Sequence, residues 1–98
     1  MFSAQARVAS DRPERYVKQV VEHLSHRLTT RVEADGRGVV EVAGGRCTLT
    51  PEPGALVLAA VGDDEVALRH AQDVVGRHLE RFGARAGLRV EWSSVEGG

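Results

Sequence analysis

The amino-acid sequence predicts an α+β fold, a two-layer sandwich in which two helices cover one face of a mostly antiparallel sheet. Three patterns in the 98 residues lead to this prediction. Two stretches place apolar residues at helical spacing, six shorter stretches are extended and mostly alternate in polarity, and glycine or proline separates most of them. The predicted element order is β-α-β-β-β-β-α-β, and a chain of this length forms a single domain, residues 1–98.

The first strand and the first helix follow from the N-terminal residues. Phe2 to Ala9 alternates between small or apolar and polar residues, which is typical of a half-buried strand. Asp11 can accept hydrogen bonds from the first helical amides and Pro13 is tolerated in the first turn, so we expect a helix from about Arg12 to Arg27. Its apolar stripe consists of Val17, Val20, Val21, Leu24 and Leu28.

Four extended segments come next. The residues predicted to share the inward faces are Leu28, Thr30, Val32 and Ala34 in the first segment, Val40 and Val42 in the second, Cys47 and Leu49 in the third, and Leu56, Leu58 and Ala60 in the fourth. Turn sequences separate them at Asp35–Gly38, Gly44–Gly45 and Pro51–Gly54. The last segment, Ala55 to Val61, is apolar on both sides. Either it is a central strand with cover on its outer face, or it contributes to a contact between subunits.

A second helix and a closing strand complete the pattern. Asp63, Asp64 and Glu65 form an acidic first turn, and Gly83 is placed to end the helix in the left-handed conformation. The apolar stripe between them consists of Leu68, Ala71, Val75, Leu79 and Phe82. Alternation from Leu88 to Trp92 predicts the closing strand, and we expect residues 94–98 to form a loose tail.

The net charge, the aromatic content and the apolar runs of the chain limit the kinds of molecule that we expect it to bind. Thirteen basic and fourteen acidic residues give a net charge of −1, and aromatic residues make up 4% of the chain, so we expect no nucleic-acid partner. The longest nearly apolar run, from Ala55, is too short to span a membrane, and no apolar signal segment opens the chain. A single cysteine, Cys47, suits a reducing compartment. We therefore expect a cytoplasmic protein without a membrane partner.

Sequence motifs of the common enzyme classes are absent: there is no phosphate-binding loop, nucleophile elbow or paired-cysteine motif. Cys47 can act as a nucleophile beside a histidine, but it alternates with Leu49 on the inward face, and free cysteine is among the most buried residue types. We therefore expect Cys47 in the core and a protein that is not an enzyme, and we rank catalysis by Cys47 or a histidine last.

The histidines are the sharpest candidates for a binding site. His23 and His26 lie three residues apart on the first predicted helix, and His78 lies at the edge of the second apolar stripe. If the helices are antiparallel neighbours, His23 and His78 face one another. Three imidazoles then form a candidate transition-metal site, His23, His26 and His78. The alternative is that His23 and His78 are packing or hydrogen-bonding residues between the helices and that His26 is solvated.

Three arginines form a second candidate. Arg77, Arg81 and Arg85 lie four residues apart near the end of the second predicted helix and can bind an anion together. Their place at the negative end of a helix explains them without a ligand.

Five segments, DRPERY, HLSHR, AGGRCTLT, GRHLERFG and LRVEW, occur in an order that resembles a small bacterial family, domain of unknown function 2218 (DUF2218). The resemblance implies a fold like that of the TATA-box-binding protein and of the C-terminal phosphohexomutase domain. It also implies an accessory role in iron and siderophore handling, beside a siderophore-interacting ferric reductase. His23 and His26 fall in the H-x-x-H stretch of the family and His78 in its H-L-E-R-F stretch, but the resemblance carries no catalytic residue.

Three functions follow as expectations. The first is a non-enzymatic accessory or binding protein linked to iron or siderophores, with a transition metal as its cofactor. The second is a structural interaction module, a homodimer formed through Ala55 to Val61. The third, by analogy of fold and from the arginines, is an anion-binding or phosphosugar-binding domain.

Overall fold

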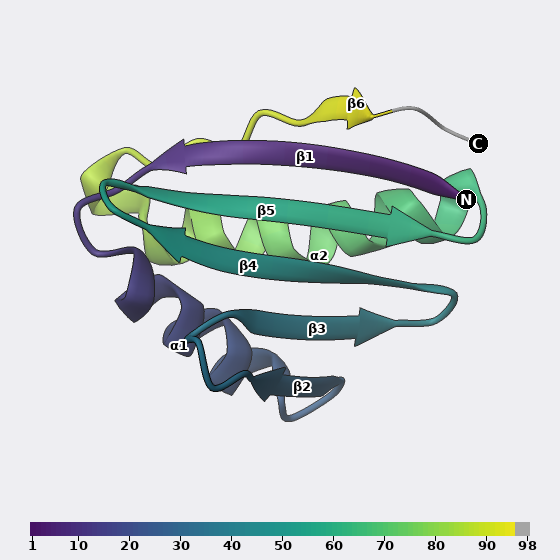
Figure 1. Ribbon diagram of the computed structural model, residues 1–98, viewed down its shortest axis with the longest axis horizontal. Helices are drawn as coiled ribbons and strands as arrows, with labels where there is room; N and C mark the ends of the chain where they lie inside the picture. The colour runs from purple at the N-terminus through teal and green to yellow at the C-terminus, as the bar shows by residue number, and fades with distance from the viewer. Residues whose placement is uncertain (96–98) are drawn as a thin grey trace.

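Two helices cover one face of a six-stranded sheet in the computed structural model, which describes residues 1–95 (Figure 1). The strand order is β2-β3-β4-β5-β1-β6, and every neighbouring pair is antiparallel. The elements are β1 Phe2–Ala9, α1 Pro13–Leu24, β2 Thr29–Val32, β3 Gly38–Val42, β4 Gly45–Glu52, β5 Ala55–Gly62, α2 Glu65–Phe82, the 3-10 helix η1 Ala84–Ala86, and β6 Ser93–Val95. The predicted α+β class and element order are confirmed.

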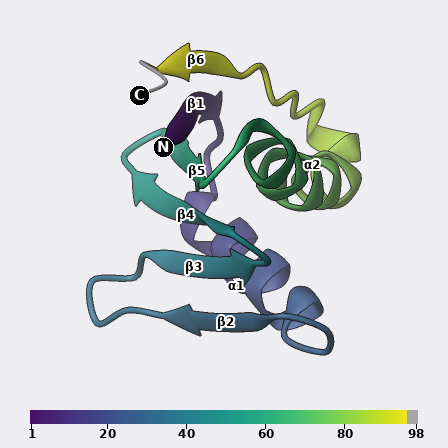
Figure 2. The ribbon, with the colours of Figure 1, turned by 90° about the vertical axis from the view of Figure 1, so that its right-hand side faces the viewer.

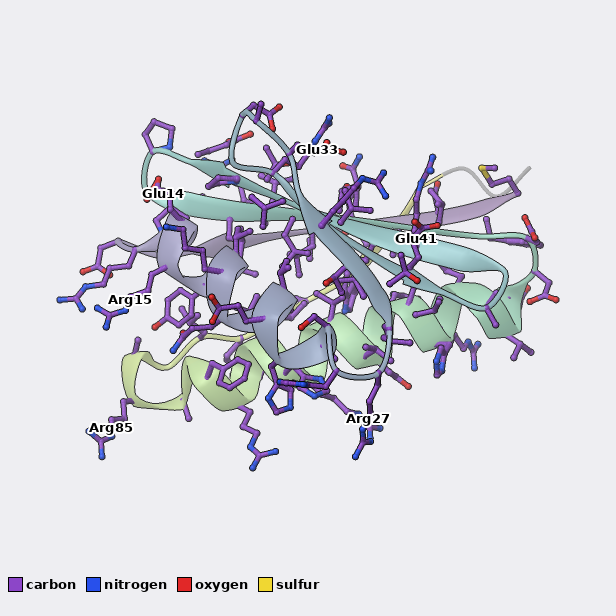
Figure 3. The ribbon with its side chains drawn as sticks, turned by 90° about the horizontal axis from the view of Figure 1, so that it is seen from below. Glu14, Arg15, Arg27, Glu33, Glu41 and Arg85 are labelled. Atoms are coloured by element: carbon purple, nitrogen blue, oxygen red, sulfur yellow. The ribbon has the colours of Figure 1, made fainter. Side chains whose placement is uncertain are left out.

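The connections explain why both helices lie on the same side, as Figure 2 shows. β1 and β5 are neighbours in the sheet. Helix α1 connects β1 to β2 at one edge of the sheet, and α2 with η1 connects β5 to β6 at the other edge. The helices run in roughly opposite directions beneath the sheet (Figures 1 and 3). Their ends therefore bring residues from distant parts of the sequence together.

Tight hairpins join β3 to β4 and β4 to β5. Val42 pairs with Gly45 and Glu52 with Ala55, so each loop has two residues. Gly44 and Gly54 both have a φ of 76°, a left-handed value that a residue with a side chain adopts only at a cost. The predicted break at Pro51 was wrong by two residues, because β4 continues through Pro51 to Glu52.

The core lies between the helices and the inner face of the sheet. Its largest fully buried side chains come from the central strands and from both helices: Leu49, Leu56, Leu58, Leu79, Val17, Val20, Val40, Val75 and Cys47. The predicted inward positions of β5, Leu56, Leu58 and Ala60, are all buried in this core, as are Ala6 and Val8 of β1. Burial of these apolar side chains is the main contribution to the stability of the domain.

The two helix N-termini differ. Asp64 accepts a hydrogen bond from the amide of Ala67 at 2.8 Å, which confirms the predicted acidic start of α2. The expected cap at Asp11 was wrong. Arg12 occupies the cap position of α1 without a side-chain hydrogen bond, and the hydroxyl of Ser10 accepts from the Arg12 amide instead.

The end of α2 also differs from its prediction. Gly83 has a φ of −96°, so it is not left-handed; the left-handed residue is Gly87, after η1. A β-carbon at Gly83 would overlap the Leu88 side chain. Glycine is needed at position 83 because the returning chain packs directly on the helix end.

The closing strand lies later than predicted. The strand is Ser93–Val95, paired with Ser3 to Gln5, whereas the segment from Leu88 to Trp92 is extended without strand pairing. The Glu80 carboxylate accepts a hydrogen bond from the Val90 amide at 2.9 Å, and Trp92 packs over Gly76 of α2. Alternation in this segment therefore reflects packing on the helix. Of the predicted loose tail, Ser94 and Val95 belong to β6, and residues 96–98 lie outside the described residues.

Candidate functional site

His23 and His78 are neighbours across the two helices. His23 is the penultimate residue of α1, and His78 lies in the second half of α2. Their ring centroids are 5.0 Å apart, with the planes inclined at 46°. Each histidine flanks the apolar stripe of its helix, so the antiparallel arrangement brings the two flanks together.

Phe82 restrains the imidazole of His23. The two rings meet edge to face with centroids 5.5 Å apart, and Phe82 lies 6.4 Å from the ring of His78. Edge-to-face aromatic contacts are favourable because the positive edge of one ring meets the negative face of the other. His23 is solvent-exposed, yet its ring has a defined place against two neighbours.

A backbone hydrogen bond orients the half-buried ring of His78. Its Nδ1 lies 2.6 Å from the carbonyl oxygen of Val74, one helical turn earlier. A carbonyl can only accept, so Nδ1 is the donor. In the neutral ring this leaves Nε2 without a proton, as an acceptor or a ligand atom.

His26 does not lie on the first helix. The helix prediction to Arg27 was wrong, because α1 ends at Leu24 and the next three residues form a turn. The Ser25 hydroxyl donates to the Glu22 carbonyl at 2.7 Å, and the Leu28 amide donates to the Leu24 carbonyl at 2.8 Å. Such local hydrogen bonds end a helix by using its last carbonyls.

The turn and the two helices line an open pocket of about 430 Å³. Its lining consists of His23, Leu24, His26, Arg27, Leu28, His78 and Arg81, and we call it the His–Arg pocket. All three predicted histidines line it. Figure 3 shows Arg27 beside the end of α1, where this pocket lies.

Carboxylates are missing from the lining of the His–Arg pocket. Glu22 lines a separate neighbouring hollow with His23 and His26, and Glu80 is occupied by the Val90 amide. Among residues 1–95, no carboxylate lies within salt-bridge distance of Arg27 or Arg81. The pocket therefore has two guanidiniums that form no salt bridge with a carboxylate of the described residues.

The donor set does not make a closed metal site. Within residues 1–95, no three side chains of histidine, cysteine, aspartate or glutamate are grouped closely enough to hold a metal ion. His23 and His78 form a pair, which is fewer than the three or four protein ligands usual for zinc. A metal bound here would need ligands from outside the protein, and the three-histidine site remains a prediction.

The family is established by residues 5–93, which match "Uncharacterized protein conserved in bacteria (DUF2218)". The chain belongs to DUF2218. A comparison with curated proteins gives no match. Among solved structures, the NMR structure of PA4090 from Pseudomonas aeruginosa is similar, with a TM-score of 0.79 and 27% sequence identity over 95% of this chain and 96% of that one. The likeness to the TATA-box-binding protein remains a prediction.

Cys47 of this DUF2218 chain is a core residue, as predicted. It is fully buried on the inner face of β4, and its sulfur lies 3.7 Å from the Thr48 carbonyl oxygen. Burial raises the pKa of the Cys47 thiol to about 12. At neutral pH it is protonated and shielded, so it is not an activated nucleophile.

Of the three predicted arginines, Arg77 and Arg81 lie one turn apart on α2, and Arg85 lies on η1. All are exposed, but only Arg81 lines the His–Arg pocket. Arg85 belongs to η1, toward the opposite end of the helical layer from Arg27 (Figure 3). The guanidinium that joins Arg81 is Arg27, which helical spacing could not identify because it lies in the turn after α1.

The outer face of β5 has no covering layer. Val57, Ala59 and Val61 are half-buried between neighbouring strands, and both helices lie on the other side of the sheet (Figure 2). Of the two alternatives for this strand, the central position is confirmed but the outer cover is not present in residues 1–95.

Neither α1 nor α2 has the length and apolar composition of a membrane-spanning helix, and residues 1–95 contain no other candidate helix.

Proposed function

We propose that this DUF2218 protein is a non-enzymatic binding protein whose ligand occupies the His–Arg pocket. One observation carries the proposal: three imidazoles and two guanidiniums from both helices and a turn line a single pocket together with two leucines. Concave sites that combine apolar side chains with a few convergent polar groups are typical of ligand binding.

The role in iron or siderophore handling, beside a ferric reductase, is part of this proposal. The His23–His78 pair supports it, because a neutral imidazole nitrogen is a common ligand of transition metals and the Nε2 of His78 is oriented by its bond to Val74. With only two adjacent imidazoles, the protein would contribute part of the coordination of such a metal and the bound chelator the rest.

Native mass spectrometry of the full chain tests this function. We expect a stoichiometric adduct from at least one of four probes: Zn²⁺, Cu²⁺, ferric citrate and phosphate. The adduct should be lost in His23→Ala/His26→Ala, which removes two exposed side chains without touching the core. His70→Ala, exposed on α2 outside the pocket lining, is the matched control. No adduct with any probe would contradict the proposal.

A second candidate function is a homodimeric interaction module. The observation that favours it is the uncovered outer face of β5, with Val57, Ala59 and Val61. The same mass spectra report the number of subunits. Val57→Lys should then dissociate a dimer, whereas Val32→Lys, at an exposed position on β2, should not. A strictly monomeric protein at micromolar concentration would contradict this candidate.

A further inference from the structure

We propose that the ligand of the His–Arg pocket is an organic anion with two or more acidic oxygens, held between Arg27 and Arg81. The inference rests on the proposed function, since it assigns a ligand class to the same pocket. Arg27 comes from the turn after α1 and Arg81 from the last turn of α2, so two guanidiniums reach one cavity from different segments. A planar guanidinium donates two parallel hydrogen bonds to a carboxylate or a phosphate.

The charges that face this pocket are positive or neutral. Besides the two arginines they are the imidazoles of His23 and His26 from the α1 side and of His78 from α2. Of the carboxylates nearest along the chain, Glu22 lines the neighbouring hollow with His23 and His26 and not this pocket, and Glu80 accepts from the Val90 amide. A bare divalent cation would meet uncompensated repulsion here, whereas an anion would supply the missing counter-charge.

The helix dipoles do not cancel this field. Both helices present their C-terminal ends near the pocket, and each end is equivalent to about half a negative charge. Those ends are also capped, because the carbonyls of Val21 and Leu79 accept from Ser25 and Gly83, both at 2.9 Å. Two full guanidinium charges therefore exceed the two partial charges.

Size and shape favour an organic anion over a single inorganic ion. The cavity of about 430 Å³ falls within the range usual for small organic ligands. Leu24 and Leu28 also line the pocket and supply apolar surface for a carbon skeleton.

Isothermal titration calorimetry of the full chain tests the inference with three probes: citrate, inorganic phosphate and Zn²⁺. We expect citrate to bind at least about tenfold more tightly than phosphate, the difference that one charge-assisted contact supplies. Arg27→Gln and Arg81→Gln should each weaken citrate binding by about tenfold or more. Arg85→Gln, exposed and outside the lining, should leave it unchanged.

The outcomes separate the two proposals. Zn²⁺ binding that requires His23, without citrate or phosphate binding, would leave the proposed function standing and overturn the anion. Phosphate binding as tight as citrate would overturn the organic class. Citrate binding unchanged in both arginine variants would also overturn the inference. Binding by none of the probes would overturn both proposals. Because Arg27 and Arg81 are exposed, circular dichroism should confirm that the variants fold.

Discussion

Two pairs of arginines, one on the outer face of the sheet and one in the His–Arg pocket, differ in whether a carboxylate neutralises their charge. On the outer face of the sheet, Arg7 contacts Glu52 at 2.7 Å, and Arg31 contacts Glu33 and Glu41 at 3.0 and 3.1 Å. The hydrogen bond to Glu33 raises the pKa of Arg31 above its usual value. In the His–Arg pocket, Arg27 and Arg81 have no such partner among residues 1–95.

On the outer face of the sheet the charges of Arg7 and Arg31 are paired with carboxylates, whereas in the His–Arg pocket the arginine charges are not paired with any carboxylate that the structure describes. The outer face combines ion pairs with a half-buried apolar strip, a composition suited to contact with protein. The His–Arg pocket combines unpaired positive charge with a concave shape, a composition suited to a small anion. The same residue type therefore indicates different functions according to its neighbours.

The largest expected effect distinguishes the inner side of β5 from its outer side. Leu58 is fully buried on the inner side of β5, while Val57 lies half-buried on the outer side. We expect Leu58→Ala to lower the free energy of unfolding by about 2–5 kcal/mol. Val57→Ala should lower it by at most about 1.5 kcal/mol. Urea unfolding measures both, and equal losses would show that the outer face is covered as the inner one is.

A second effect concerns the buried thiol of Cys47 on the inner face of β4. Because burial raises the folded-state pKa of Cys47 to about 12, its contribution to stability is complete below the ordinary thiol pKa and is lost as the pH rises toward 12. Above about pH 9, the free energy of unfolding should fall by up to about 1.4 kcal/mol per pH unit more than in Cys47→Ala. Parallel pH profiles for the two proteins would contradict this. At pH 7.5, a thiol reagent should label Cys47 only after denaturation.

The smallest expected effect is on the free energy of unfolding when one arginine from each region is replaced. Arg7→Gln breaks an exposed ion pair, so the free energy of unfolding should fall by at most about 1 kcal/mol, and less in high salt. Arg27→Gln breaks no ion pair among the described residues, so stability should be unchanged or slightly raised. Thermal unfolding of both variants makes the comparison. A larger loss in Arg27→Gln would show that Arg27 is a structural residue.

Periodicity was sufficient to predict most of the fold. Alternation over Phe2 to Ala9 and helical spacing over Val17 to Leu24 identify faces that must be buried, and burial dominates the architecture. Where the prediction of Leu88 to Trp92 as a strand was wrong, the cause is tertiary. The segment does alternate, but its alternate side chains pack on α2 and its Val90 amide bonds to Glu80, which alternation alone does not reveal.

The site was partly visible in the sequence. His23 and His78 flank apolar stripes, so two packed antiparallel helices bring them together. Arg27 was not predictable as a pocket residue, because its position depends on where α1 ends, and the hydrogen bonds around Ser25 decide that. The charge balance of the pocket also depends on the direction of Glu80, which only the path of the returning chain determines.

The central claim is that ligand binding belongs to the His–Arg pocket and not to the outer face of the sheet. A citrate titration followed by two-dimensional ¹H–¹⁵N NMR at pH 6 tests it most directly. We predict saturable shifts at His23, Arg27, His78 and Arg81, with none along Val57 to Val61. Shifts confined to the outer face, or no shift at any residue, would contradict the account.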